Sequence, residues 1–179
     1  MITAVSVNDL SLPSEDIIPA VRGEFYAYTA EFSPERPLYF LMKCKANKAR
    51  SLAIDIDHLL RELDLTFIFG EEVILCSPNS APSVGLLRGA LTDPDLQRLN
   101  ETEIRLAPMP VSRFHRSGER RSGLALVDAF KGAGSSVSAV RLSQEMTLSV
   151  RTASNKYALI RVGEVAGSRC RLEACHILL

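Results

Sequence analysis

Tryptophan is absent from this 179-residue chain, and aromatic residues make up only 6% of it. Long apolar runs are also missing: the longest, residues 38–42 and 65–69, fall far short of the ~20 residues that a membrane-spanning helix requires. Residues 1–9 have neither a basic start nor a sustained apolar stretch, so they do not resemble a secretory signal. We therefore expect a cytoplasmic protein that makes no membrane contact.

Cysteine is scarce, with four residues at Cys44, Cys76, Cys170 and Cys175. In the absence of an export signal, we expect these thiols to be reduced and mostly buried rather than paired in disulfides. Cys170, Cys175 and the adjacent His176 suggest zinc ligands, but a regular strand would send Cys175 to the face opposite the other two. The sequence therefore predicts no metal site here.

Strong catalytic and cofactor-binding motifs are missing as well. The glycine-containing run at residues 131–136 faintly resembles a phosphate cradle, yet it lacks the G-x-x-x-x-G-K-[ST] order of a P-loop. There is no G-x-S-x-G elbow of a serine hydrolase and no H-E-x-x-H pair of a zinc protease. We expect no cofactor, and we favour a non-enzyme over an enzyme.

Neither sign of charge is in excess, because 21 basic side chains balance 21 acidic ones, which argues against a general nucleic-acid binder. The distribution along the chain is uneven. Residues 1–112 carry ten basic and sixteen acidic side chains, a net of −6, whereas residues 113–179 carry eleven and five, a net of +6. Such halves can attract each other, allow two copies to associate, or direct the second half to an anionic partner.

Hydrophobic residues, at 46%, are close to the globular average, and a chain of this size can bury roughly 70% of its unfolded surface. We expect a single domain over residues 1–179, with a soft boundary in the loop region 107–136. Residues 21–32 alternate as a strand does, residues 33–37 predict a turn, and residues 38–45 predict a returning strand, which together make a hairpin.

Residues 47–64 fit two periods. Their apolar residues match an amphipathic helix begun by Asn47 or Ser51, although residues 52–57 also alternate as a strand would. We favour the helix, with Leu52, Ile56, Leu59, Leu60 and Leu63 facing the core. Its opposite stripe contains Ser51, Asp55, His58 and Glu62, which we interpret as a solvated face, with a shared metal ion or an oriented imidazole as the alternative.

Shorter elements follow along the chain. The sequence predicts a hairpin of residues 65–69 and 73–76 around Gly70-Glu71, a loop at 77–83 and a strand at 84–91. A short helix beginning near Thr92 or Asp93 with Pro94 as its first helical residue, a strand around 104–106 and a helix at 123–131 come next.

The last third of the chain predicts a β-meander of residues 146–151, 157–162 and 169–178. Because strands and helices do not alternate regularly, we predict an α+β fold: a mostly antiparallel sheet with one principal helix and a C-terminal β-meander. A parallel doubly wound sheet is the alternative, if residues 52–57 are a buried strand.

The segment 113–121 concentrates positive charge around one aromatic residue, Phe114. Guanidinium groups grip phosphate oxygens, an aromatic ring stacks on a base, and histidine can transfer a proton during phosphodiester cleavage. An exposed linker whose arginines pair with the acidic first half is the simpler interpretation. The candidate anion-binding or nucleic-acid-binding residues are Arg113, His115, Arg116, Arg120 and Arg121.

From these observations we expect a non-catalytic binding or regulatory module that acts through protein–protein contacts, with self-association as one form. The alternative is a protein that binds nucleic acid or phosphate esters, such as a nuclease, through residues 113–121.

Overall fold

The computed structural model describes residues 24–41, 49–50, 52, 55–110, 114 and 123–178. Its helices are α2 (Ile56–Glu62), α3 (Ala81–Leu87), α4 (Asp93–Leu96) and α6 (Gly123–Lys131). Its strands are β1 (Glu24–Phe32), β2 (Leu38–Tyr39), β3 (Ala49–Arg50), β4 (Leu65–Ile68), β5 (Ile74–Cys76), β6 (Thr102–Leu106), β7 (Ser136–Val137), β8 (Ala139–Arg141), β9 (Thr147–Thr152), β10 (Lys156–Ala166) and β11 (Arg169–Leu178).

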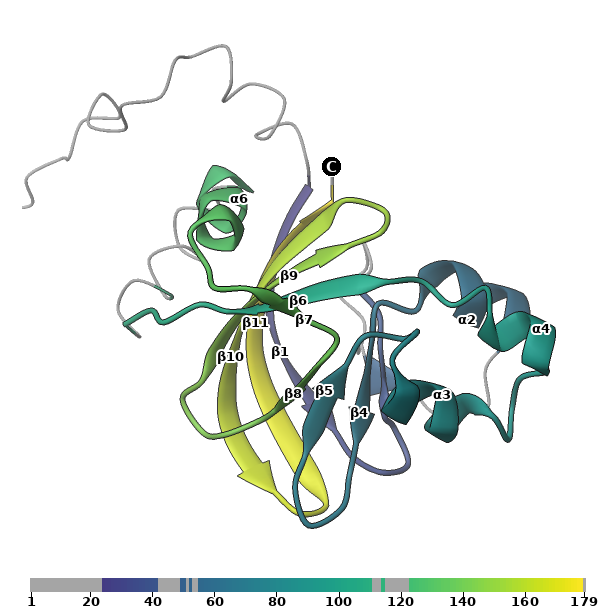
Figure 1. Cartoon of the computed structure of the whole chain (residues 1–179). Helices are drawn as coiled ribbons and strands as arrows, with labels where there is room; N and C mark the ends of the chain where they lie inside the picture. The colour runs from purple at the N-terminus through teal and green to yellow at the C-terminus, as the bar shows by residue number, and fades with distance from the viewer. Residues whose placement is uncertain are drawn as a thin grey trace, which may run out of the picture.

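Two sheets form the centre of the molecule. The first has the order β1-β11-β10-β9-β6-β7 and the second the order β3-β2-β4-β5-β8. Every strand pairing among the described residues is antiparallel, which confirms the α+β class and the C-terminal meander of β9, β10 and β11. Figure 1 shows the two sheets between α6 on one side and α2, α3 and α4 on the other.

The main core lies between the sheets, and strand alternation selects its residues. Leu148 and Val150 of β9 face it from the first sheet, while Leu65 and Phe67 of β4 face it from the second. The ring of Phe32 stacks on that of Phe67 with 4.1 Å between centroids. Each buried side chain of this size contributes about 1.5–3 kcal/mol through burial.

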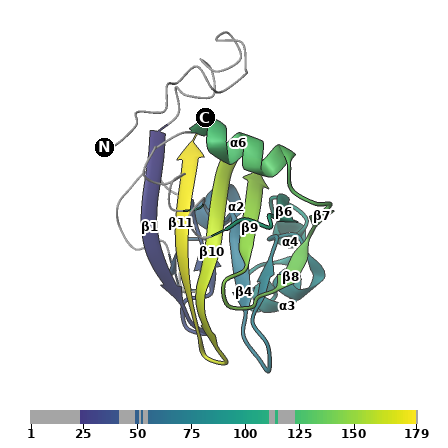
Figure 2. The same ribbon diagram turned by 90° about the vertical axis from the view of Figure 1, so that its left-hand side faces the viewer.

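Helices cover the outer faces. On the second sheet, Leu38 and Phe40 alternate with the inward-facing Tyr39 and Leu41, so they pack against the leucines of α2, α3 and α4. On the first sheet, α6 packs against β9, β10 and β11, and Figure 2 shows it lying across the upper ends of these strands. No helix in the described part of the chain is long and apolar enough to cross a membrane.

The two sheets are also joined along one edge by consecutive strands. β7 pairs with β6 in the first sheet, and after Ser138 the chain continues as β8, which pairs with β5 in the second. Neither strand is predictable from the sequence, because each has only two or three residues and little burial.

The hairpin predicted for residues 21–45 is wrong, although both strands and the turn are present. β1 pairs with β11 in one sheet, whereas β2 pairs with β3 and β4 in the other. Within the described residues 24–41, an isolated bridge between Ser33 and Arg36 is the one β-pairing that links the two arms. The turn at 33–37 therefore carries the chain from one sheet to the other instead of returning it. Turn residues identify a change of direction but not the strand that follows as partner.

The principal helix is shorter than predicted. Residues 49–50 form β3, and α2 begins at Ile56, where the Asp55 side chain accepts a hydrogen bond from the His58 N–H at 3.0 Å as a helix N-cap. Leu59, Leu60 and Leu63 are buried as predicted. Leu52 is half-buried, and Ile56 is 44% exposed because it lies in the first turn, beyond the core.

Other predicted elements have mixed outcomes. The hairpin of β4 and β5, the short helix α4 and α6 followed by Gly132 are confirmed. Thr92 is the N-cap of α4, and Pro94 is its second residue, not its first as predicted. The strand predicted at residues 84–91 is wrong, because residues 81–87 form α3, begun by a proline in its first turn. The hairpin loop at 69–73 is also longer than the two-residue turn predicted at Gly70-Glu71.

Candidate functional site

The basic segment singled out in the sequence lies outside the described residues, with one exception. The five candidates Arg113, His115, Arg116, Arg120 and Arg121 are all outside them. Phe114 is described, and it is buried in a cluster with Ala107, Leu126 and Leu159 between α6 and the first sheet. This position corrects the idea that Phe114 stacks on a nucleic-acid base.

The glycine-containing run after α6 is engaged in backbone hydrogen bonds. The N–H groups of Gly132, Ala133 and Gly134 donate to the carbonyls of Asp128, Phe130 and Leu106 in turn. A phosphate cradle needs N–H groups that point at a ligand. These three N–H groups already have partners: the first two end α6, and the third joins the run to β6.

The polar side chains predicted along one face of α2 make different contacts from one another. Asp55 caps the helix, the imidazole of His58 stacks on Phe40 at 5.4 Å between centroids, and Glu62 forms an ion pair with Lys156 at 3.6 Å. These partners account for Asp55, His58 and Glu62 without a metal ion. Ser51 lies outside the described residues.

Cys76 and Cys170 are both buried and free of disulfides. Burial raises the pKa of the Cys76 thiol to about 11 and that of the Cys170 thiol to about 12. A thiol with so high a pKa carries almost no thiolate at neutral pH, so neither side chain is a ready nucleophile.

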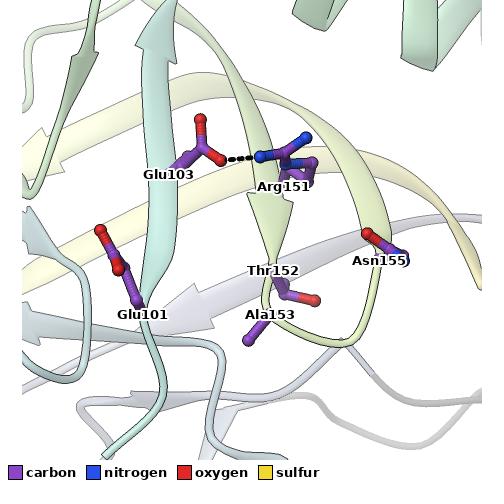
Figure 3. Close-up of a pocket in the computed structure, with 6 residues that line it drawn as sticks. All are labelled: Glu101, Glu103, Arg151, Thr152, Ala153 and Asn155. Atoms are coloured by element: carbon purple, nitrogen blue, oxygen red, sulfur yellow. Dashed lines mark hydrogen bonds and ion pairs between the residues drawn. The ribbon is translucent and has the colours of Figure 1, made fainter.

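A polar hollow of about 290 Å³ lies where the start of β6 meets the turn between β9 and β10. Figure 3 shows its two walls, with glutamates along β6 on one side and the β9–β10 turn on the other. The residues that line it are Glu101, Glu103, Arg151, Thr152, Ala153 and Asn155. The two walls are neighbours because β6 and β9 pair in a register that sets Thr102 opposite Thr152.

The Arg151 guanidinium is fixed in place by its surroundings. Glu103 accepts a hydrogen bond from it, and Arg151 also lies 5.4 Å from the centroid of the Phe130 ring of α6. Hydrogen bonds to Glu103 and then Tyr157 hold the pKa of Arg151 above its ordinary value. The second carboxylate oxygen of Glu103 accepts from Arg105, 3.3 Å away, so this glutamate bridges two arginines.

The turn wall depends on side-chain contacts to its backbone. Asn155 adopts a φ of 55°, the left-handed conformation that asparagine tolerates better than most residues. The Thr152 hydroxyl accepts a hydrogen bond from the Lys156 N–H at 3.2 Å and also contacts the Ser154 hydroxyl. These contacts place Thr152 and Asn155 at the rim of the hollow.

A buried ion pair lies behind the hollow. The ammonium of Lys156 donates to both carboxylate oxygens of Asp64, at 3.0 and 3.2 Å. The Leu41 N–H donates to the same carboxylate at 2.7 Å, and the Thr102 hydroxyl donates to the Asp64 carbonyl at 2.6 Å. Burial, opposed by the charge of Lys156, raises the pKa of Asp64 to about 6.

Nothing in the sequence alone predicts this hollow. Its walls come from residues 101–103 and 151–155, and no motif links segments about fifty residues apart in one sequence. The only available signal is the pair of carboxylates two residues apart, just before the strand predicted around residues 104–106, and such a pattern is common on exposed strand faces. In chemical terms the hollow offers a fixed guanidinium, carboxylates, an amide and a hydroxyl, which are groups for binding polar ligands.

Comparisons with known proteins give a likeness of fold alone. No protein-family model matches the chain, and no curated protein matches it. A solved structure of a DUF4466 family protein from Parabacteroides merdae is similar, with a TM-score of 0.52 and 10% sequence identity. The match covers 88% of this chain and 54% of that one, so this chain spans about half the length of the protein it resembles.

Proposed function

We propose that the chain is a non-catalytic binding module that acts through contacts with a protein partner, and that the hollow at the start of β6 receives a polar segment of that partner. The observation that carries this proposal is that the Arg151 guanidinium is already held in one orientation while its side chain stays partly exposed. Its side chain is held by Glu103 and Tyr157 and remains 41% exposed at the hollow. A guanidinium that is already oriented loses less entropy when it binds.

The opposite wall supplies a complementary charge. Glu101 is exposed and forms no ion pair with any residue that the structure describes, whereas Arg151 has five N–H donors, more than its two acceptors need. A peptide segment that offers a carboxylate to Arg151 and an ammonium or N–H group to Glu101 matches both walls. Complementary charges of this kind give an interface its specificity more than its affinity.

The size of the hollow favours a side chain or a chain terminus as its occupant. Pockets for drug-sized molecules and cofactors usually measure about 300–1,000 Å³ and are mostly apolar. This hollow, at about 290 Å³, falls just below that range, and its lining is mostly polar. A short polar peptide segment meets both conditions.

The proposal is tested with a displayed library of short peptides selected on the full chain. Peptides that bind the wild type should bind Arg151→Ala at least about tenfold more weakly, a loss of about 1.4 kcal/mol. Arg169→Ala is the matched control, because Arg169 pairs with Glu31 beyond the far end of β10. A library that yields no binders, or binders indifferent to Arg151→Ala, would contradict the proposal.

A further inference from the structure

One buried residue is tied to both walls of the hollow. Asp64 lies between α2 and β4 and is only 3% exposed. Its carbonyl accepts a hydrogen bond from Thr102, the residue after Glu101 on the β6 wall. Its carboxylate accepts from the Lys156 ammonium, while the Lys156 N–H donates to Thr152 on the turn wall. The position of each wall therefore depends on Asp64.

Few charges surround the Asp64 carboxylate. Among the described residues, the charged groups beside it are Lys156 at the start of β10 and Glu62 at the end of α2, the latter 3.6 Å from the Lys156 ammonium. The segment after β2 adds the uncharged Leu41 N–H, and β6 adds the Thr102 hydroxyl and no charge. Lys156 is thus the counterion on which an ionised Asp64 depends.

We propose that Asp64 is a positioning residue that makes the turn wall of the hollow sensitive to pH. When the carboxylate is ionised, it holds Lys156 and with it the turn of residues 152–156. When the carboxylate is protonated, Lys156 loses its main counterion and turns toward Glu62, so the turn wall is released. This inference rests on the proposed function, because the wall that moves belongs to the binding hollow.

Release of the turn does not require unfolding. A protonated Asp64 can still accept the Leu41 N–H, and its carbonyl still receives the Thr102 hydroxyl. The β6 wall therefore keeps its anchor, and the change is confined to the side of the hollow that Lys156 holds. The transition falls near pH 6, where burial places the pKa of Asp64.

The experiment is a nuclear magnetic resonance titration of the wild-type chain from pH 4.5 to 8. The side-chain carboxyl carbon of Asp64 and the amides of residues 152–156 should shift together with one midpoint near 6. The inference is overturned if Asp64 titrates near 4, as an ordinary carboxyl group does, or if the turn amides do not follow it.

Two further measurements separate this transition from other titrations. In Asp64→Asn the midpoint near 6 should disappear from the turn amides, and if that variant does not fold, Lys156→Gln should uncouple the amides from Asp64 instead. An unperturbed histidine titrates at about 6.5, so His58→Gln and the imidazole signals are recorded as controls. Turn amides that follow an imidazole, and lose their shift in His58→Gln, would assign the transition to histidine and reject the proposal.

The outcomes distinguish this inference from the proposed function. If turn amides titrate with Asp64 but no peptide binds, the pH sensitivity of the turn wall is supported and the binding function is rejected. If peptides bind equally at pH 5 and pH 7.5 and the turn does not titrate, the binding function is supported and the pH sensitivity of the turn wall is rejected. If both hold, selected peptides should bind more weakly at pH 5 than at pH 7.5 in the wild type, and this difference should vanish in Asp64→Asn.

Discussion

At the scale of single residues, the pair of Lys156 and Asp64 should have a strongly pH-dependent effect on stability. At pH 8, Lys156→Met leaves an ionised, buried Asp64 without its counterion, which should lower the free energy of unfolding by about 3–5 kcal/mol. The pKa of folded Asp64 is raised to about 6, so at pH 4.5 the folded state already holds its proton and the substitution removes little. Urea melts at both pH values measure the difference.

The control for this variant is Lys131→Met at the exposed end of α6, which should change stability by less than about 0.5 kcal/mol at either pH. Equal losses for Lys156→Met at pH 4.5 and pH 8 would show that Lys156 stabilises the fold through packing of its aliphatic stem and not through Asp64.

The cysteines give a second prediction at this scale. Because burial raises the pKa values of Cys76 and Cys170, a thiol reagent should label both slowly in the native protein at pH 8. In denaturant, all four thiols should react, since we expect no disulfide. Fewer than four reactive thiols in the unfolded chain would reveal a disulfide, and rapid native labelling at Cys76 or Cys170 would count against their burial.

At the scale of elements, α2 offers a matched pair of substitutions within one helix. Leu59→Ala should cost about 2–5 kcal/mol, because Leu59 is 1% exposed and its truncation leaves a cavity. Ile56→Ala should cost less than about 1 kcal/mol, because Ile56 is 44% exposed and transfers little surface into the core. Denaturant melts that reverse this order would contradict the assignment of the buried face.

Elements with local signals were predictable from the sequence, and elements defined by distant partners were not. The alternation of β9 and β10 and the start of the short helix near Thr92 each depend on a few neighbouring residues, so the sequence predicts both. β1 and β2 were identified as strands, but their partners are β11 and β4, which the sequence does not specify. Local sequence sets the type of an element better than its pairing.

The candidate site failed to appear in the sequence for the same reason. Glu103 and Arg151 meet because β6 and β9 pair after a long connection that includes α6, β7 and β8. The periodicity of residues 47–64 assigns Asp64 to a helix, whereas the structure buries it after α2 as the partner of Lys156. The spacing of apolar residues in one sequence does not show which charged residues will be buried and paired in the folded protein.

At the scale of the whole molecule, strands from distant parts of the chain interleave in both sheets. The segment 107–136, predicted as a soft boundary, separates β6 from its partner β9 and β5 from its partner β8. The β1 strand also pairs with β11 from the other end of the described chain. Since these pairings cross the supposed boundary, we expect the chain to unfold as one cooperative unit.

This expectation is checked by following thermal or urea unfolding with circular dichroism and with tyrosine fluorescence. One coincident transition by both probes fits a single domain over residues 1–179. Two separated transitions would show that the sequences on either side of residues 107–136 fold independently, despite their shared sheets.

The distribution of charge over the whole chain bears on the alternative function in nucleic-acid binding. The chain is neutral overall, and its surplus of positive charge is confined to residues 113–179. Phe114, the aromatic residue of the basic segment, is buried and cannot stack on a base. A neutral protein with one short basic run should bind a single-stranded oligonucleotide weakly and without a defined site.

We therefore expect fluorescence anisotropy to show no sub-micromolar binding of an oligonucleotide at 0.15 M salt. Replacing Arg116 and Arg120 by alanine should leave the weak residual binding unchanged, because no specific contact is lost. If those arginines do grip phosphates, affinity should fall steeply with salt, and each alanine should reduce the logarithmic salt slope by about one. Tight, salt-sensitive binding abolished by these substitutions would replace the protein-binding proposal with a nucleic-acid function, since counterion release on that scale requires several arginines acting together on the phosphate backbone.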